Sequence, residues 1–253
     1  MKKPLFISGI MLLLALIPAK GQQNLSAEEI VRRADEKFRG EKSSITDMTM
    51  TIVRPTWKRT VSFRSWSSGS DYALTLVTAP AKEKGQAFLK RENEMWSWNP
   101  SISRMIKLPP SMMSQGWMGS DYTNDDIMRE SSLVKDYTHE LLREEEYAGR
   151  KCYVIQMKAK EDADVIWGKQ LRWIDEENLL FLKAELYDED GYLVRTETGS
   201  DIKLMDGRLV TAHLELIPAE EDGNKTVLQI DRVTFNPPID NSFFSIQNMK
   251  KVR

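Results

Sequence analysis

Few side chains in this sequence have the types and spacings that catalysis or metal binding requires. The two histidines, His139 and His213, lie in separate strand-like runs without a second histidine at metal-site spacing. The stretch LYDEDGYL (186–193) resembles the start of a calcium loop but lacks the distal bidentate glutamate. No G-x-S-x-G motif places a serine as an esterase nucleophile. We therefore expect a protein that is not an enzyme, with no catalytic residue, metal site or cofactor.

The single cysteine, Cys152, lies in the strand-like run KCYVIQM. One cysteine cannot form an internal disulfide, so the stability of the fold must come from its core. A free cysteine in an apolar run is typical of a small buried side chain, and a reactive thiol is the alternative.

The chemistry that the sequence offers instead is apolar contact, in a segment where no regular element is expected. Residues 104–131 read RMIKLPPSMMSQGWMGSDYTNDDIMRES, with five methionines and one tryptophan among prolines, glycines and serines. Methionine is flexible and polarisable, and it is overused on surfaces that accept variable apolar shapes. We therefore predict a lid over an apolar hollow. Its inner surface is expected to consist of Met112, Met113, Trp117 and Met118, with Gly116 and Gly119 as joints and a helix over 125–134 as support.

The elements that must position this lid are mostly strands. In ITDMTMTIVR, alternation places Met48, Met50 and Ile52 on one face, and in EMWSWN it places Trp96 and Trp98 on one face. We expect all five side chains to line the hollow as ligand-binding residues. Alternation fixes a shared face but not which face is concave, so ordinary core is the alternative for the two tryptophans.

Turn residues divide the C-terminal half into regular runs. Asp190-Gly191, Asp206-Gly207 and Asp222-Gly223 are strong hairpin signals, because both central positions of such a turn favour positive φ. The runs between turns are 137–147, 151–160, 168–175, 179–188, 192–204, 208–218 and 225–235, and the earlier runs are 45–54, 59–66, 71–79, 85–92, 94–99 and 103–108. The prediction is a mainly β (α+β) fold. We expect a curved, incompletely closed antiparallel β-barrel of roughly ten or eleven strands, with a few covering helices and the lid.

One helix is expected before the strands. Ser26 can cap it and Glu29 follows three residues later, which is the arrangement of a capping box. Ile30, Ala34 and Phe38 recur every four residues on one face. Such a helix needs an apolar surface to cover.

The N-terminal residues have the pattern of a secretory signal peptide. Lys2 and Lys3 precede an apolar run from Leu5 to Ile17, which is too short to span a bilayer, and small residues lead to a cleavage site near Gly21. We expect residues 1–21 to be removed and 22–253 to form a single domain in the periplasm; an uncleaved membrane anchor is the alternative. Without residues 1–21, 33 basic residues face 38 acidic ones, for a net charge of −5. This balance argues against nucleic acid as a partner.

Three stretches resemble the LolA-like family of outer-membrane lipoprotein-sorting proteins, in its extended branch. They are SAEEIVRRADEKFRG, WSWNPSISRMIKLPPSMMSQGWMGSDYTNDDIMRES and VTFNPPIDNSFFSIQNMKKV, of which MGSDYTNDDI is the most specific. The resemblance implies an incomplete β-barrel with a helical lid and an apolar cavity for acyl chains. It also implies a strand arginine that bonds the lid, for which Arg54, Arg59 and Arg64 are all candidates.

Together these observations predict a monomeric periplasmic carrier, or chaperone. It is expected to bind acyl chains of lipoproteins or lipids and to move them toward the outer membrane. An inner-membrane transporter and an outer-membrane acceptor are candidate partners. The alternative is a non-carrying periplasmic accessory subunit of an inner-membrane exporter.

Overall fold

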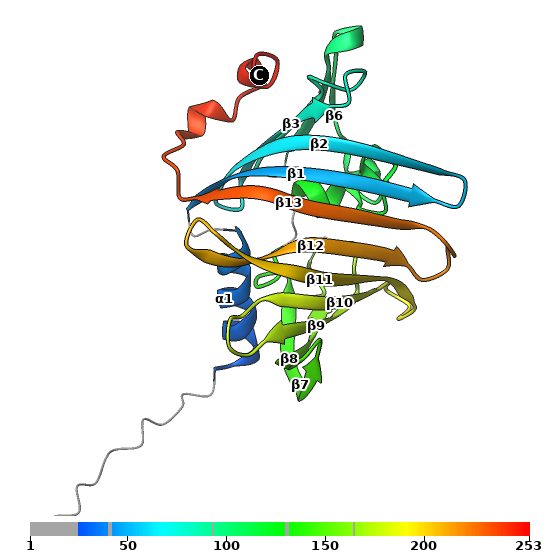
Figure 1. Cartoon of the computed structure of the whole chain (residues 1–253), viewed down its shortest axis with the longest axis vertical. Helices are drawn as coiled ribbons and strands as arrows, with labels where there is room; N and C mark the ends of the chain where they lie inside the picture. Colours follow the sequence, from blue (N-terminus) through cyan, green and yellow to red (C-terminus); the bar gives the residue numbers. More distant parts are fainter. Residues whose placement is uncertain (1–24, 40–41, 93, 130–131, 164) are drawn as a thin grey trace, which may run out of the picture.

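The computed structural model describes residues 25–39, 42–92, 94–129, 132–163 and 165–253. Within them, thirteen antiparallel strands form one strongly curved sheet (Figure 1). Its order is β6-β5-β4-β3-β2-β1-β13-β12-β11-β10-β9-β8-β7. The strands are β1 (Ser43–Arg54), β2 (Trp57–Ser68), β3 (Tyr72–Ala79), β4 (Ala87–Arg91), β5 (Glu94–Asn99), β6 (Arg104–Lys107), β7 (Tyr137–Tyr147), β8 (Arg150–Ala159), β9 (Lys169–Asp175), β10 (Phe181–Tyr187), β11 (Leu193–Met205), β12 (Arg208–Pro218) and β13 (Lys225–Phe235).

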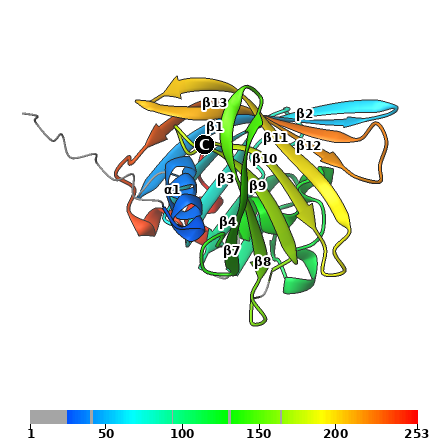
Figure 2. The same ribbon diagram turned by 90° about the horizontal axis from the view of Figure 1, so that it is seen from below.

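The sheet consists of two meanders, β1 to β6 and β7 to β13, which are joined by pairing between the long strands β1 and β13. Strands β7 to β13 follow one another in space as in the chain, and β13 then pairs with β1 to attach the N-terminal meander. In the described part of the chain, the edge strands β6 and β7 do not pair with each other. The barrel is therefore open, and the view from below shows the sheet curling around its interior (Figure 2).

The predicted fold class and the C-terminal meander are confirmed, but the strand count was too low. The short runs EMWSWN and SRMIKL form separate strands, β5 and β6, which pair in register from Trp96 with Lys107 to Asn99 with Arg104. A run of four to six residues is weak evidence for a strand when it is taken alone. Pairing with a neighbour stabilises it, and that neighbour lies elsewhere in the sequence.

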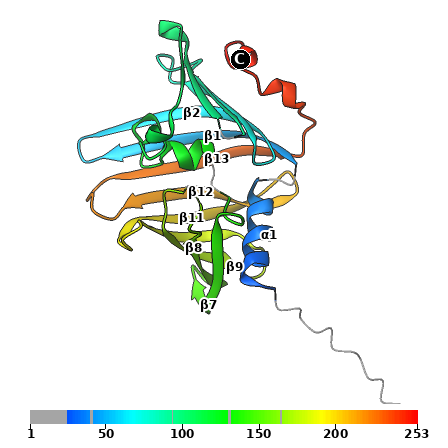
Figure 3. The same ribbon diagram turned by 180° about the vertical axis from the view of Figure 1, so that it is seen from behind.

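Helix α1 (Ala27–Arg39) covers the concave side of the C-terminal meander (Figure 3). The Oγ of Ser26 accepts a hydrogen bond from the N–H of Glu29 (3.1 Å), as the capping pattern predicts. Ile30 and Ala34 are buried against Tyr137 and its neighbours on β7 to β9. The remaining helices are short: η1 (Pro100–Ile102), η2 (Pro110–Met112), η3 (Trp117–Gly119), the π-helix η4 (Asp125–Arg129), η5 (Asn241–Phe243) and α2 (Ile246–Met249).

Candidate functional site

The concave face of the N-terminal meander is closed by the segment that contains the methionines. Trp117 is 1% exposed and makes edge contacts with Phe63 and Phe88, each with ring centroids 5.3 Å apart. Met50 and Ile52 on β1 lie in the same cluster and are fully buried. The indole of Trp117 therefore fills the space over β1, β2 and β4 that an apolar ligand would otherwise occupy.

Two cavities adjoin this inner cluster, each of about 190 Å³. The first lies between α1 and the strands around β1 and β13, and its apolar lining includes Met48, Phe63 and Ile230. The second lies between α1, the lid and β9 to β12, and its lining includes Trp167 and Arg195. Phe38 of α1 and Leu228 of β13 line both cavities. The hollow is thus one interior divided by a few side chains.

Two strand arginines hold the tip of the lid. Arg54 Nη2 lies 2.8 Å from Asp121 Oδ1, and the two side chains are 15% and 7% exposed. Arg54 Nη2 also donates to the carbonyl of Gly119 (3.2 Å), and Arg59 Nη2 donates to the carbonyl of Met118. Thr226 of β13 donates to Asp121 as well, at 2.6 Å. The lid is therefore tied to β1, β2 and β13 at once.

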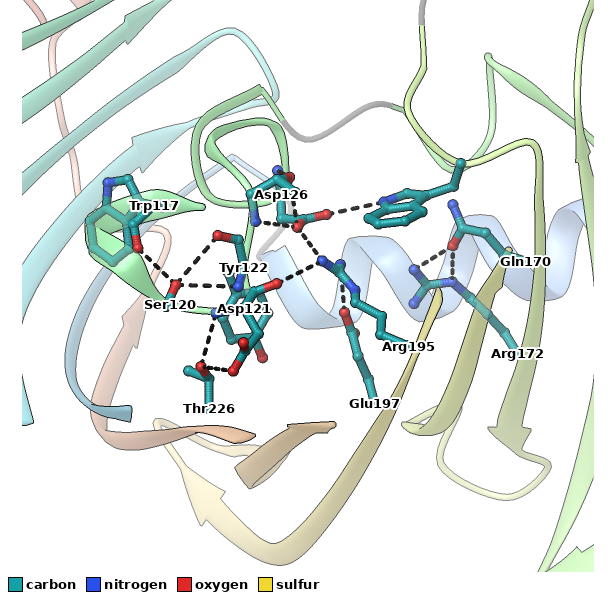
Figure 4. Close-up of polar contacts among 12 residues, drawn as sticks. Trp117, Ser120, Asp121, Tyr122, Asp126, Gln170, Arg172, Arg195, Glu197 and Thr226 are labelled. Carbon is teal, nitrogen blue, oxygen red and sulfur yellow. Dashed lines mark hydrogen bonds and ion pairs between the residues drawn. The ribbon is translucent and has the colours of Figure 1, made fainter. Parts of the chain in front are cut away.

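A buried ion-pair network holds the base of the lid (Figure 4). Arg195 of β11 donates through Nη1 to Asp126 Oδ2 at 2.6 Å and through Nη2 to Glu197 Oε1 at 2.8 Å. Trp167 Nε1 donates to the other oxygen of Asp126 at 3.2 Å. Burial alone would raise the pKa of Asp126, but the charge and hydrogen bond of Arg195 outweigh it and lower that pKa. Asp126 is therefore an anion within an apolar interior, and Arg195 is its counter-ion.

Comparison with solved structures identifies the fold. A DUF1329 family protein from Desulfovibrio piger superposes with a TM-score of 0.80 at 24% identity, covering 88% of this chain and 97% of that one. A domain named for outer membrane lipoprotein sorting, from Vibrio parahaemolyticus, gives 0.78 at 22%, covering 88% and 98%. A LolA superfamily protein from Nitrosomonas europaea gives 0.76 at 24%, covering 88% and 99%.

A family model described as "Uncharacterized protein" matches residues 69–251, which is more than half of the chain. The chain belongs to this family, and its fold is LolA-like. No curated protein matches the sequence.

In this LolA-like fold the lid residues expected from sequence differ in burial. Trp117 and Met113 are buried, at 1% and 8% exposure, and Met113 packs against Met95 of β5. Met118 is half-buried against the inner cluster. Met112 is half-buried at the end of η2 and is absent from the core clusters of the described residues. Three of the four side chains therefore face the interior.

The support and joints of the lid differ from the expectation. Of the predicted helix over 125–134, residues 130–131 lie outside the described residues, and the described part forms only the five-residue η4, whose start is capped by reciprocal bonds between Thr123 and Asp126. Gly116 closes a tight turn in which Trp117 N–H donates to the carbonyl of Tyr122 at 2.7 Å. A Cβ at Gly116 would lie 2.6 Å from the carbonyl of Ser120. Gly116 is therefore required for a close approach, whereas Gly119, at φ +75° with open space around it, allows the reversal of the chain.

Trp96 and Trp98 do not reach the hollow, which corrects the expectation for these two residues. Pairing runs from Trp96 to Leu89, Leu74 and Trp66, so these side chains share one face. Met48 pairs instead with Phe63 and lies on the opposite, concave face. On the outer face the tryptophans pack beneath the C-terminal segment, which contributes the residues Phe243, Phe244 and Met249.

The three candidate arginines are now distinguished, and a fourth was missed. Arg54 and Arg59 contact the lid, whereas Arg64 bonds Asp47 at 2.6 Å on the outer face. Arg195 was not singled out, because its partner Asp126 is 69 residues away in the sequence. The sequence did contain one signal for Arg195. Arg195 and Glu197 are two residues apart in a strand, so they share a face, and charged side chains are unexpected on a face that should be apolar.

Cys152 and the two histidines each contact neighbouring residues of the fold. Cys152 is fully buried among Val154, Trp173 and other core residues, and burial raises the pKa of its thiol to about 11. Its predicted place as a small apolar core residue is confirmed. His139 bonds the carbonyl of Leu133 (2.7 Å), and His213 bonds Gln229 (3.2 Å).

Proposed function

We propose that this protein is a periplasmic carrier that binds acyl chains of a lipoprotein or lipid in its hollow and moves them toward the outer membrane. The observation that carries the proposal is the inner cluster. There, Trp117 from an irregular segment is inserted between Phe63 and Phe88, and other residues of this cluster, such as Phe63 and Tyr122, line the two cavities. A side chain that enters an interior from a loop can leave it at less cost than one that belongs to a strand.

The cavities in this state are smaller than the 300–1,000 Å³ that is usual for sites of drug-sized ligands. Withdrawal of Trp117 and Met113 would join the space above β1 and β2 to the first cavity. Burial of each CH₂ group of a ligand contributes about 0.8 kcal/mol, so an acyl chain can replace the contacts that the indole and thioether give up. The lid exchanges one set of apolar contacts for another and keeps its own apolar side chains out of water in both states.

The proposed location depends on residues 1–21, which lie outside the described residues. Their signal-peptide pattern and the lipoprotein-sorting name of one structural neighbour support the periplasm. None of the helices in the described part of the chain is long and apolar enough to cross a bilayer.

A second candidate, the accessory subunit of an exporter, is favoured by one end of the sheet. The β1–β2, β10–β11 and β12–β13 turns lie together there by strand register, and Gly223 approaches Pro55. This end exposes several large apolar side chains, namely Trp57, Tyr192, Leu193, Val194 and Ile217. Such a rim could contact another protein without any ligand in the hollow.

Lipid extraction separates the two candidates. The protein is purified from its native envelope, extracted and analysed by mass spectrometry, and the same preparation is offered fluorescent fatty acid and acylated lipoprotein. The carrier proposal expects stoichiometric lipid or saturable uptake. A clean extract together with no uptake of either probe would favour the accessory role.

A variant pair makes the test specific to the lid. Met113→Glu places a carboxylate among Met95, Phe88 and Leu108, so it should weaken acyl binding strongly. Met112→Glu, on a half-buried neighbour outside this cluster, is the matched control with a smaller expected loss. Equal losses for both variants would mean that the buried thioether of Met113 has no special part in binding.

A further inference from the structure

The second cavity is lined by two arginines with different surroundings, Arg195, which is buried, and Arg172, which is half-buried (Figure 4). Arg195 is neutralised by Asp126 and Glu197 at 2.6 and 2.8 Å. Arg172 of β9 has no carboxylate within ion-pair distance among the described residues. Its Nε and Nη2 both donate to a single neutral oxygen, Oε1 of Gln170, at 3.0 and 2.7 Å.

The donors of Arg172 are not exhausted by this contact. A guanidinium carries five N–H donors, and no residue in the described part of the chain accepts a hydrogen bond from Nη1. One face of the group is covered by the ring of Phe181, whose centroid lies 5.1 Å from Cζ. The free donors therefore belong to a charged group that is held in a fixed orientation at the wall of the cavity.

Gln170 adds a second donor to the same wall. Arg172 can only donate, so the amide of Gln170 must turn its oxygen toward the guanidinium and its NH₂ away from it. Gln170 is 1% exposed, and within the described ranges nothing accepts a hydrogen bond from that NH₂. Arg172 and Gln170 thus line the same cavity, and both have N–H donors without an acceptor among the described residues. The one acceptor of the pair, Gln170 Oε1, is already bonded to Arg172.

The position of Arg172 destabilises its charged form. Burial lowers the pKa of Arg172, because the charged guanidinium is kept from water, while Glu197 and Asp35 act in the opposite direction from beyond ion-pair distance. Glu197 is already bonded to Arg195, and Asp35 has a contact of its own. A buried charge without a paired counter-ion is destabilising unless a ligand supplies one.

The first cavity lies beside the second and has a mainly apolar lining. It shares Phe38 and Leu228 with the second cavity and is lined by the apolar residues Met48, Phe63, Ile230 and Val233. Its one lining lysine, Lys90, already donates to the carbonyl of Ser70 at 2.5 Å and has a further contact. The two adjoining cavities therefore offer a mainly apolar compartment beside a compartment with unused cationic donors.

We infer that the hollow selects an acyl lipid with an anionic head, a carboxylate or a phosphate, whose oxygens bind Arg172 and Gln170 in the second cavity while the chain occupies the first. This inference rests on the proposed function and narrows it. Ester- and amide-linked acyl groups without a charged head could accept a hydrogen bond from Arg172 but would leave it without a counter-ion. The inference therefore favours an anionic lipid over an uncharged acyl anchor as cargo.

The test compares lipids that differ only in the head. Binding of pyrene-labelled hexadecanoate, its methyl ester and the matching alkyl phosphate is measured by fluorescence, below the concentrations at which they aggregate. The wild-type protein should bind one or both anions at least roughly tenfold more tightly than the ester, the range expected for a charge-assisted hydrogen bond. Inorganic phosphate alone should not compete, because it lacks the chain. The stronger of the two anions identifies the head.

Arg172→Gln should abolish this preference and leave binding of the methyl ester unchanged. Because the variant removes a half-buried cation without a paired counter-ion, its midpoint of thermal unfolding should equal or exceed that of the wild type, so loss of folding is not expected. Arg64→Gln, on the outer face, is the matched control and should keep the preference. Equal wild-type affinities for ester and anions, or an unchanged ratio in Arg172→Gln, would overturn the inference while leaving the carrier proposal standing. Failure to bind any of the three lipids would overturn both.

Discussion

Two clusters that contain tryptophan lie on opposite faces of the N-terminal meander, and their covers are attached differently. On the concave face, Trp117 belongs to the cover, which is tied to the sheet by ion pairs of Arg54 and Arg195. On the outer face, Trp96 and Trp98 belong to the sheet, and the C-terminal segment covers them with apolar side chains such as Phe244. The same residue types thus form a plug on one face and a permanent core on the other.

The difference indicates how a removable cover can be recognised. An apolar cover is stabilised by its whole buried area, so partial withdrawal costs free energy at every step. The lid instead combines a small apolar plug with directional ion pairs at its tip and base, each of which is either formed or broken. This arrangement favours two discrete positions, closed and open, over gradual loosening.

The largest effect is expected on the outer face. Phe244 is fully buried and stacks near Tyr72 and Phe243, so Phe244→Ala should lower the free energy of unfolding by about 3–5 kcal/mol. Because Phe244 lines neither cavity of the hollow, the affinity for an acyl probe should not change. Urea denaturation and probe titration measure the two quantities. An altered affinity in a folded variant would show that the two faces are coupled.

Trp117→Ala should have a smaller effect on stability and a larger one on binding. The lid segment can settle into the vacated space, so we expect a loss of about 1–3 kcal/mol, below the about 3–5 kcal/mol that truncation of a buried aromatic side chain usually costs. A probe would no longer have to displace the indole, so its affinity should rise. Titration with a fluorescent fatty acid measures this. A fall in affinity would instead mean that the contacts of Trp117 with the bound chain outweigh the cost of displacing it.

The contrast between the clusters also shows what sequence alone could supply. Local turn chemistry at Asp190-Gly191 and the similar turns placed the C-terminal strands almost residue by residue. The alternation of side chains along a strand placed Trp96 and Trp98 on a common face. Whether that face is the concave or the outer one depends on which segments cover each side of the sheet. That depends on contacts between distant segments, as between Trp66 and Phe243. The lid was recognised from its composition, whereas its anchors were not, because ion pairs across 69 residues leave no local pattern.

Arg54→Gln and Arg64→Gln compare two arginine–aspartate pairs of the same meander. The Arg54 pair is mostly buried and joins the lid, so its loss should cost about 1–3 kcal/mol and speed the uptake of an acyl probe. The Arg64 pair is 38% and 25% exposed on the outer face, so its loss should cost at most about 1 kcal/mol. Stopped-flow uptake and thermal unfolding test both variants. Equal uptake rates would mean that Arg54 does not restrain the lid.

The smallest effect is a dependence on pH that arises from Asp126 at the base of the lid. Burial raises the pKa of Asp126, but Arg195 and Thr123 lower this pKa by more than burial raises it. The pKa of Asp126 is therefore below that of an ordinary aspartate. A carboxyl group whose folded-state pKa is depressed adds stability above its unfolded pKa, near 3.9, and that stability is lost as the pH falls through the lower folded-state value. The base of the lid should therefore hold unchanged from neutral pH down to about pH 4 and loosen only below it.

Asp126→Asn isolates this contribution from other acidic groups. Asp47, whose pKa is lowered first by the hydrogen bond from Arg64, titrates in the wild type and the variant alike and cancels from the difference. At pH 7 the variant should be less stable and should take up an acyl probe faster, because an amide oxygen is a poorer partner for the buried Arg195. As the pH falls from about 4, the difference between the two proteins should shrink, since protonation removes the same charge from the wild type. A difference that stays constant to acid pH would show that the charge of Asp126 does not fasten the lid. Trp117 would then be held in place by its apolar contacts and by the bonds of Arg54 and Arg59 at the tip of the lid.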